Sequence, residues 1–521
     1  MFGWNVSYAG DVNGDGYPDI IVGAPYNDTD ISFSWGASDT KVNQNSDSAD
    51  QQDCAMAIDP DGNIIVVWND WRVSGMDQEI YAQKFSPQGD PLWGSSDILV
   101  NQYSDGSDDQ KYPDIAIDSD GNAIVVWEDN RDGATTKWDI YAQKLNSSGI
   151  PQWSSSDVKV NLNSDTENQY RPRVDVDSNG VAIVVWYDYR SGTHYDIYAQ
   201  NISSSGTVGW GSSDKLVNQN SDTDDQWSPS VAIDSGSNAI IVWGDDRGAT
   251  RDIYAQNLSS SGSPQWGSSD KLVNQNSDSA SQGSPDVAID SNGNAIVVWD
   301  DGRTDRDIYS QKLNSTGSAH WGSSDKKVNQ NSDTEYQWKP HVTIDSDDNA
   351  IVAWEDDRNS GSFVEDIYAQ KINSTGEAKW GSYDVKVSHA PDSSDQGYVD
   401  VAVDSSGNTY FVWHDERNSE EDIYAQKIEP GTDMGAAYIF FGYPGISSND
   451  INATNANVSI YGEAAGDYFG WDVSDLGDVN GDGLDDIIIG APGYDDANIV
   501  SRVWGANDLK VNPTEVAAGE N

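Results

Sequence analysis

Cysteine, histidine and positive charge are all scarce in this chain of 521 residues. The single cysteine, Cys54, excludes a disulfide framework and any zinc site built from several cysteines. The five histidines occupy unrelated positions, and no serine–histidine–aspartate set is visible, so the sequence predicts no enzyme. Only 29 basic residues face 87 acidic ones, for a net charge of −58, which disfavours nucleic acid as a partner.

Long apolar segments are also missing. No run approaches the roughly 18 apolar residues of a membrane-spanning helix, so no membrane span is expected. The first residues, Met1 to Trp4, have neither the basic start nor the apolar core of a secretory leader. The sequence begins and ends within recognisable motifs, so we expect a fragment of a longer protein.

The sequence contains instead a short repeated motif. An apolar run ends in Trp, and Asp and Arg follow two and four residues later. Seven copies recur at intervals of 55 to 59 residues, a period typical of propellers and solenoids. The repeated tryptophans are Trp68, Trp127, Trp186, Trp243, Trp299, Trp354 and Trp413.

Each copy reads as four short strands without a helix. In the second copy we expect strands at residues 113–118, 123–127, 139–145 and 157–161, the third of them half exposed because it alternates apolar and polar residues. Four strands in such a period match a propeller blade. The array opens with a fourth strand, 40–44, and closes without one, so this segment should complete the last blade. The sequence thus predicts an all-β fold with a seven-bladed propeller over residues 31–433.

The segments that flank the ring differ from it. Residues 2–25 read FGWNVSYAGDVNGDGYPDIIVGAP, and residues 469–492 read FGWDVSDLGDVNGDGLDDIIIGAP. Both resemble the FG-GAP repeat of integrin α-type β-propellers. In that family a strand of the type GAAYIFFG follows GAP shortly, whereas here it occurs at residues 435–442. The resemblance therefore implies that the ring is inserted into one FG-GAP blade.

This interpretation divides the chain into five segments. Residues 1–30 form the first half of an FG-GAP blade, and 434–465 form its second half around the ring. Residues 466–500 begin the next FG-GAP blade. Residues 501–521 resemble the opening strand of a further propeller insertion.

Both FG-GAP segments contain an acidic loop that predicts a Ca²⁺ site. Oxygen-bearing side chains stand at positions 1, 3, 5 and 9, position 7 can offer a backbone carbonyl, and glycine permits the sharp turn. Calcium takes six to eight oxygen ligands, which this spacing can wrap around one ion. The loops also resemble the calcium loops of integrin α subunits. The expected ligands are Asp11, Asn13, Asp15, Tyr17 and Asp19 in the first loop, and Asp478, Asn480, Asp482, Leu484 and Asp486 in the second.

The repeated Trp, Asp and Arg allow two interpretations. Side chains spaced by two residues on a strand project to the same side. They could form structural ion pairs between blades, with Arg also pairing the Asp that opens the next strand, or seven equivalent ligand pockets. The similar ring turns, such as residues 59–63, are expected to be hairpin turns, because the copies do not keep their middle carboxylate.

Taken together, the sequence predicts an extracellular, calcium-binding propeller for adhesion or recognition of a protein or glycan at the cell surface. A multivalent carbohydrate-binding propeller is the alternative, and a glycosidase-like enzyme is a third. Several Asn-x-Ser/Thr sequons are candidate glycosylation sites, although such sequences also suit turns. Five of them follow the third strand of a repeat, namely Asn146, Asn201, Asn257, Asn314 and Asn373.

Overall fold

The computed structural model is built from β-strands, with no helix in the part of the chain that it describes. The chain forms two compact units, Phe33–Glu429 and the combination of Met1–Ser32 with Pro430–Asn521. The described residues are 5–10, 18–24, 32–35, 39–44, 49–72, 77–102, 108–131, 137–153, 156–162, 167–219, 223–248, 250–275, 280–303, 305–330, 335–358, 364–380, 384–389, 394–417, 420–429, 436–440, 458–461, 472–477, 486–489 and 502–504.

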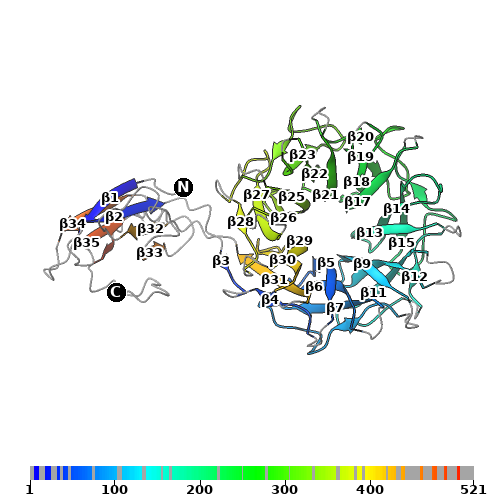
Figure 1. Ribbon diagram of the computed structural model, residues 1–521, viewed down its shortest axis with the longest axis horizontal. Coiled ribbons are helices and arrows are strands. Elements are labelled where there is room, and N and C mark those ends of the chain that lie inside the picture. Colours follow the sequence, from blue (N-terminus) through cyan, green and yellow to red (C-terminus); the bar gives the residue numbers. More distant parts are fainter. Residues whose placement is uncertain are drawn as a thin grey trace. The chain divides into compact units, whose positions relative to one another are not determined.

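The larger unit is a ring of seven antiparallel sheets (Figure 1), which confirms the seven-bladed propeller. Blades 1 to 7 follow the chain, and within each blade the strands pair in sequence order from the axis outward. The strands of blades 1 to 4 are β5 (Gln51–Ile58), β6 (Ile64–Asp70), β7 (Glu79–Phe85), β8 (Ile98–Leu99), β9 (Gln110–Ile117), β10 (Ala123–Asp129), β11 (Asp139–Leu145), β12 (Val158–Lys159), β13 (Gln169–Val176), β14 (Ala182–Asp188), β15 (Asp196–Ile202), β16 (Lys215–Leu216), β17 (Gln226–Ile233), β18 (Ala239–Asp245), β19 (Asp252–Leu258) and β20 (Lys271–Leu272). Those of blades 5 to 7 are β21 (Gln282–Ile289), β22 (Ala295–Asp301), β23 (Asp307–Leu313), β24 (Lys326–Lys327), β25 (Gln337–Ile344), β26 (Ala350–Asp356), β27 (Asp366–Ile372), β28 (Val385–Lys386), β29 (Gln396–Val403), β30 (Thr409–Asp415) and β31 (Asp422–Glu429).

The ring closes as the offset of the repeats predicts. Strand β4 (Thr40–Lys41), from the start of the ring, pairs with β31 in blade 7, where Lys41 lies opposite Tyr424. The short strand β3 (Ser32–Phe33) joins the same sheet beside β31. One blade therefore combines both ends of the ring sequence, which locks the propeller into a closed circle.

Two strand predictions were inaccurate. The first strand of blade 2 begins at Gln110, before the expected start at Pro113, because the proline occupies a β-bulge where no ladder hydrogen bond is needed. The third strand was expected to be half exposed, yet in β11 every residue after Asp139 is buried. Neighbouring blades cover both of its faces, so its alternating pattern does not report exposure.

The core lies between adjacent blades. All seven repeated tryptophans are completely buried. Trp127, for example, packs against Ile65 and Val67 of the preceding blade. Burying a large aromatic side chain contributes strongly to stability, so the repeated motif specifies the contact from one blade to the next.

The described residues of the smaller unit form two sheets. The first pairs β1 (Asn5–Gly10), β2 (Asp19–Ala24), β32 (Ala436–Phe440) and β33 (Val458–Tyr461) in that order. Strands β2 and β32 are antiparallel, with Gly23 opposite Ala437, although the whole ring separates them in sequence. This pairing confirms that the propeller is inserted between the second and third strands of a blade.

The second sheet of this unit consists of β34 (Val473–Gly477), β35 (Asp486–Ile489) and β36 (Arg502–Trp504). Among the described residues of both units, none belongs to a helix long and apolar enough to cross a membrane.

Candidate functional site

The repeated Trp, Asp and Arg form a structural ladder around the ring. In blade 1 the indole N–H of Trp68 donates to Asp70, and the guanidinium of Arg72 forms an ion pair with the same carboxylate. The guanidinium also lies 3.8 Å from the ring centre of Tyr81. Because every repeated tryptophan is inaccessible, none can serve as a platform for a ligand. The interpretation as seven repeated pockets is wrong, and the structural interpretation holds.

The second partner of each Arg differs from the expected one. Arg72 pairs with Asp97, which precedes the fourth strand of its own blade, and not with the residue that opens the third strand. Asp97 in turn accepts the backbone N–H of Gln44 from the neighbouring blade at 3.0 Å. The same arrangement recurs around the ring, so each ion pair also ties two blades together. The second partners are Asp97, Asp157, Asp214, Asp270, Asp325, Asp384 and Asp39.

The acidic ring turns act as hairpin turns. Asp59 accepts the backbone N–H groups of Asp61 and Asn63 at 2.9 Å each. Its other oxygen pairs with Lys84 from the third strand of the blade at 2.6 Å. The carboxylate thereby closes the turn and anchors it to the sheet.

The blades differ from one another near the axis. In each innermost strand, two residues oppose the single repeated Trp, which is the geometry of a β-bulge. The first bulge residue of every blade has a left-handed backbone with φ between 46° and 52°. We call these residues the bulge ring: Asp53, Tyr112, Arg171, Ser228, Ser284, Lys339 and Tyr398.

Glycine is the residue that adopts this backbone without strain, yet no copy uses it. A left-handed residue that carries a side chain costs roughly 1–2 kcal/mol, and such strained positions are often found at functional sites. All seven copies keep the strained backbone while their side chains differ, so a function of any one of these side chains rests on its own contacts.

Buried carboxylates of neighbouring blades accept backbone N–H groups of the bulge ring. Glu128 directly follows a repeated Trp, is fully buried, and accepts the backbone N–H of Arg171 in the next blade at 2.6 Å. Its other oxygen has no hydrogen-bond partner among the described residues, and burial raises the pKa of this carboxyl to about 7. Glu355 holds the backbone N–H of Tyr398 in the same way at 2.6 Å. These contacts fix the backbone of two bulge residues across blade boundaries.

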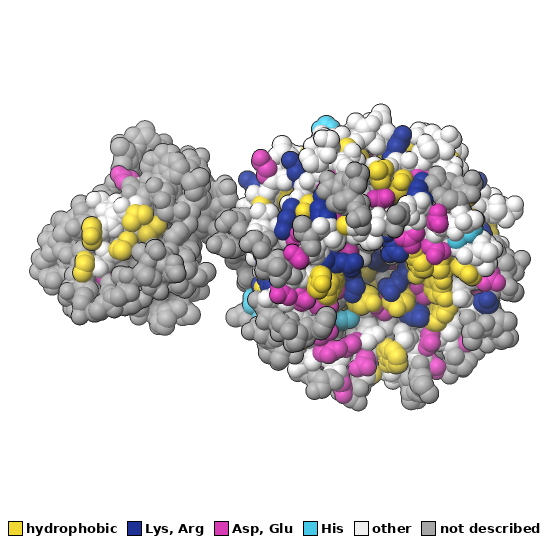
Figure 2. Space-filling model, turned by 45° about the horizontal axis from the view of Figure 1, so that its top comes forward, with side chains coloured by type: hydrophobic (Ala, Val, Ile, Leu, Met, Phe, Trp, Pro, Cys, Tyr) yellow, Lys and Arg dark blue, Asp and Glu magenta, His cyan; other side chains and the backbone are white. Residues whose placement is uncertain are grey.

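Basic and aromatic side chains gather at the axis. The guanidinium of Arg171 lies 3.6 Å from the ring centre of Tyr112, and the ammonium of Lys339 lies 4.4 Å from that of Tyr398. Lys111 lies 3.9 Å from the ring centre of Trp138. Figure 2 shows lysine and arginine side chains around the central hollow of the ring. Cation–π contacts of this kind hold the charged groups in place. The Lys339 ammonium is in addition paired with Glu355 at 2.9 Å.

Inner strands of five blades converge on a small axial cavity of about 40 Å³. Arg171 is distinctive in this cavity. Among the eleven arginines with described side chains, the other ten lie within 4.0 Å of a described carboxylate, and Arg171 does not. The cavity is lined by Asp53, Cys54, Ala55, Tyr112, Pro113, Asp114, Arg171, Arg173, His341, Tyr398, Val399 and Asp400.

A pair of glutamates lies beside Lys339 at the same end of the blades. Burial raises the pKa of Glu365 to about 8, and the charge of neighbouring Glu355 and a hydrogen bond to it add to this effect. Glu355 is fully buried and accepts from the Trp338 indole N–H and the Lys339 ammonium. Glu365 is only half-buried, so it can hold a proton at neutral pH and still reach a ligand.

Most of the expected calcium ligands lie outside the described residues, namely Asp11, Asn13, Asp15, Tyr17, Asp478, Asn480, Asp482 and Leu484. Asp19 is fully buried at the start of β2, opposite Gly10. Asp486 opens β35 opposite Gly477. The two aspartates thus occupy equivalent places in their sheets.

Both ends of the chain match the FG-GAP repeat, over residues 2–42 and 469–504. A sequence search of curated proteins found no match. Solved structures with a similar fold include a protein of unknown function from Dyadobacter fermentans, with 9% identity, a TM-score of 0.46, and coverage of 77% of this chain and 99% of that one. They also include two carbohydrate-active enzymes.

One is an α-L-arabinanase from Penicillium chrysogenum in complex with arabinobiose, with 10% identity, a TM-score of 0.42, and coverage of 75% of this chain and 98% of that one. The other is the GH93 α-L-arabinofuranosidase of Fusarium graminearum, with 11% identity, a TM-score of 0.42, and coverage of 76% and 98%. The expectation that this chain is not an enzyme is therefore corrected, because similarly folded propellers include glycoside hydrolases and the architecture gives no ground for that exclusion.

Proposed function

We propose that the propeller recognises an acidic glycan at the bulge ring, whose axial cavity of about 40 Å³ has room for an anionic group and not for a whole sugar ring. The observation that carries this proposal is the state of Arg171, which is held on a strained backbone against Tyr112 and has no ion pair with a described carboxylate. In a chain with three times as many acidic as basic residues, an arginine left in this state is unexpected. Asp53 and Glu128 balance its charge at longer range, and an anionic group of a ligand would be a partner in direct contact.

The chemistry of the cavity fits such a ligand. A guanidinium forms two parallel hydrogen bonds to a carboxylate or sulfate, which adds geometric specificity to the attraction. The faces of Tyr112 and Tyr398 offer flat, amphipathic surfaces beside the charge. The Lys339 ammonium on the same bulge ring is already paired with Glu355 at 2.9 Å, so Arg171 is the cation that the proposal rests on. An acidic sugar ring combines a flat apolar face with an anionic group and can use both.

The test measures binding of an oligoglucuronate and of an uncharged glucose oligomer of the same length by calorimetry. Arg171→Gln should weaken binding of the acidic oligomer at least tenfold. Ser228→Gly, at an equivalent but exposed bulge position, is the matched control and should leave binding unchanged. Equal binding of the uncharged oligomer, or equal loss in the control variant, would contradict the proposal.

A second candidate function is acid catalysis on the same ligand. It is favoured by Glu365, which has a raised pKa and is accessible beside Lys339. A general acid must be protonated at the working pH, and a carboxyl with a pKa near 8 fulfils that condition. If this function is correct, Glu365→Gln should abolish release of reducing ends or of unsaturated products, yet keep the affinity for the oligoglucuronate. Release that persists in this variant would rule out the assigned role.

The proposal also includes the two FG-GAP segments that flank the ring, which we call the FG-GAP frame. The acidic loops that contain Asp15 and Asp482 have the spacing of oxygen ligands that calcium requires. Extracellular calcium modules often bind in the 10⁻⁴–10⁻³ M range, so an extracellular or cell-surface location would keep such loops loaded. In this proposal the frame presents the inserted ring to a glycan or glycoprotein partner, in adhesion or recognition.

A further inference from the structure

Blade 4 lacks an ion pair that four other blades contain. In blades 1, 2, 5 and 6, a lysine on the third strand contacts the carboxylate that opens the first hairpin turn. In blades 3 and 4, asparagine replaces this lysine, as Asn201 and Asn257. The four ion pairs are Lys84–Asp59, Lys144–Asp118, Lys312–Asp290 and Lys371–Asp345, with distances of 2.6–2.7 Å.

The register of the strands shows that these positions are equivalent. Asn257 lies opposite Ile240, as Lys144 lies opposite Ile124 in blade 2. The two sequons at Asn201 and Asn257 therefore begin inside strands, and do not share the turn position of the other three. In blade 3 the side chain of Ser237, from the next blade, forms a hydrogen bond with Asp177. Blade 4 shows no such substitute among the described residues.

The carboxylate of Asp234 is otherwise arranged as in the blades with a lysine. One oxygen accepts the backbone N–H groups of Gly236 and Asn238, both at 2.8 Å. The other accepts the Asn238 amide at 2.9 Å, as the equivalent oxygen of Asp290 accepts the Asn294 amide at 2.9 Å. The difference is that Asp290 also contacts a lysine ammonium, whereas no described cation contacts Asp234.

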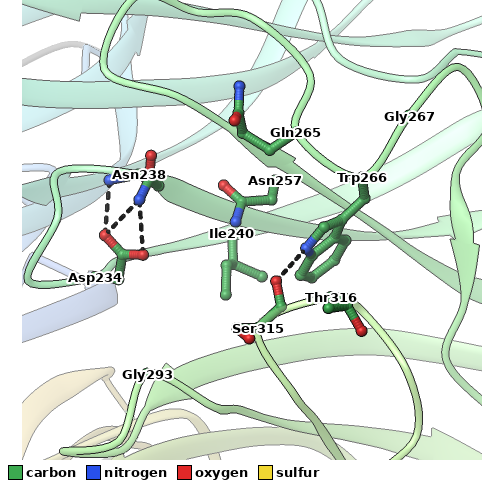
Figure 3. Close-up of a pocket in the computed structure, with 10 residues that line it drawn as sticks. All are labelled: Asp234, Asn238, Ile240, Asn257, Gln265, Trp266, Gly267, Gly293, Ser315 and Thr316. Atoms are coloured by element: carbon green, nitrogen blue, oxygen red, sulfur yellow. Dashed lines mark hydrogen bonds between the residues drawn. The ribbon is translucent and has the colours of Figure 1, made fainter.

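An open cavity of about 590 Å³ lies beside Asp234 (Figure 3). Asn257 points into it and is only 7% exposed, yet its amide oxygen has no hydrogen-bond partner among the described residues. A buried acceptor without a donor is costly. Asn201 in blade 3 has the same unpartnered oxygen, so blade 4 is distinguished by the combination of this acceptor with a carboxylate that no described cation and no described side chain of the next blade contacts. On the opposite side, the Trp266 indole N–H donates to the carbonyl of Ser315 at 2.9 Å and fixes the wall.

We infer that this cavity binds a primary ammonium group of a ligand. Asp234 provides the charge, at the carboxylate oxygen that meets a lysine ammonium in four other blades. The Asn257 amide oxygen provides a second acceptor, and Thr316 lines the cavity as a further polar group. An ammonium has three donors and suits a few convergent acceptors. Calcium requires six to eight oxygens and would find too few, because both Asp234 oxygens already accept hydrogen bonds from the turn.

This inference is independent of the axial site, because it concerns a different cavity and a ligand group of opposite charge. Two sources could bring the ammonium, an amino sugar or a lysine side chain of a protein. The test therefore uses glucosamine and Nα-acetyl-lysine amide as probes, with N-acetylglucosamine as the neutral control. The Trp266 indole signal in NMR spectra, assigned with Trp266→Phe, reports occupancy of this cavity.

We expect saturable shifts of the Trp266 signal with at least one ammonium probe and none with N-acetylglucosamine. Asn257→Lys restores the internal ion pair, so it should abolish the shifts and raise the melting temperature. The matched reverse variant, Lys312→Asn in blade 5, should create a second binding event for the same probe. Two results would overturn the inference: no shift with either ammonium probe, or shifts that persist unchanged in Asn257→Lys. An equal response to N-acetylglucosamine or to calcium chloride would do the same.

Discussion

The guanidinium of Arg417 contacts the carboxylate of Asp39 at 2.6 Å, although 378 residues separate them in sequence. Asp39 also accepts the backbone N–H of His389 at 2.9 Å. In every other blade the equivalent Arg and Asp lie close together in the sequence, as Arg72 and Asp97 do. The ladder that joins neighbouring blades therefore also joins the two ends of the ring.

Asp39→Ala should lower the free energy of unfolding by about 3 kcal/mol, because it leaves Arg417 with one carboxylate and frees the closing strand. Urea denaturation measures the loss. Asp270→Ala is the matched control, since it removes the same two contacts, to the Arg247 guanidinium and to the Gln219 backbone N–H, away from the closing segment. Limited proteolysis should cut residues 33–44 in the first variant only. Equal protection of this segment in both variants would contradict the closure argument.

Trp299→Phe should destabilise the ring by roughly 1–3 kcal/mol, because it removes a buried N–H donor to Asp301 and part of the core volume. Glycan binding at the axis should not change. Leu272→Ala, at a position that is 45% exposed, should alter stability by less than about 0.5 kcal/mol. A loss of binding at full stability in Trp299→Phe would instead revive the idea of repeated pockets.

Ser228→Gly should stabilise the protein by about 0.5–1 kcal/mol. Its backbone is left-handed with φ of 49°, and glycine removes that strain at some cost in the entropy of the unfolded chain. Thermal unfolding checks the gain. Ser228→Ala keeps the strain and should show none, so a similar gain in both variants would mean that the bulge carries no strain.

Glu365 should make stability fall as the pH rises. Its pKa is about 8 in the folded protein and near 4.5 when unfolded, so the folded state holds the proton more tightly. The stabilising contribution is complete below about pH 4.5 and is lost as the pH rises through about 8. Unfolding measured from pH 5 to 9 should show this slope in the wild type and a smaller one in Glu365→Gln.

Glu429 serves as the comparison, because its pKa is shifted in the opposite direction to that of Glu365. A hydrogen bond from Lys427 lowers the pKa of Glu429, so its contribution is present above its unfolded pKa and is lost on acidification. Glu429→Gln should therefore reduce stability at neutral pH only. An unchanged slope in Glu365→Gln would show that its proton is not held as assigned.

Calcium should stabilise the FG-GAP frame and leave the ring unaffected. At ten times the dissociation constant each loop adds about 1.4 kcal/mol. Asp15→Ala together with Asp482→Ala should remove most of this gain in calorimetry. Asp59→Ala, in a ring turn, should retain the calcium response despite its own loss of stability. A full response in the double variant would assign the ions elsewhere.

The repeats predicted the architecture because each copy encodes the same blade. Trp68 and its equivalents mark the buried strand, and the offset of residues 40–44 predicts the closure. The FG-GAP letters at residues 435–442 predict the insertion. These features depend on local patterns that are repeated seven times or that match a known family, so they are visible without coordinates.

The axial site was missed because its residue types differ from blade to blade. The backbone is left-handed at Tyr112, Arg171 and Lys339, a conformation that their residue types do not predict. Comparing the seven copies position by position would have provided a signal, since the bulge residues vary while Trp, Asp and Arg do not. The second partner of each Arg was missed for a different reason, because it lies some 25 residues away along an irregular connection.

The pairing of β2 with β32 also has a mechanical consequence. The chain enters and leaves the ring through these two adjacent strands, paired from Ile20–Phe440 to Ala24–Ala436. Tension between the flanking segments is carried first by the hydrogen bonds of this pair, which would open one residue at a time from the Ile20 end. The ring therefore stays out of the load path, and its blades remain folded, until this pair has parted.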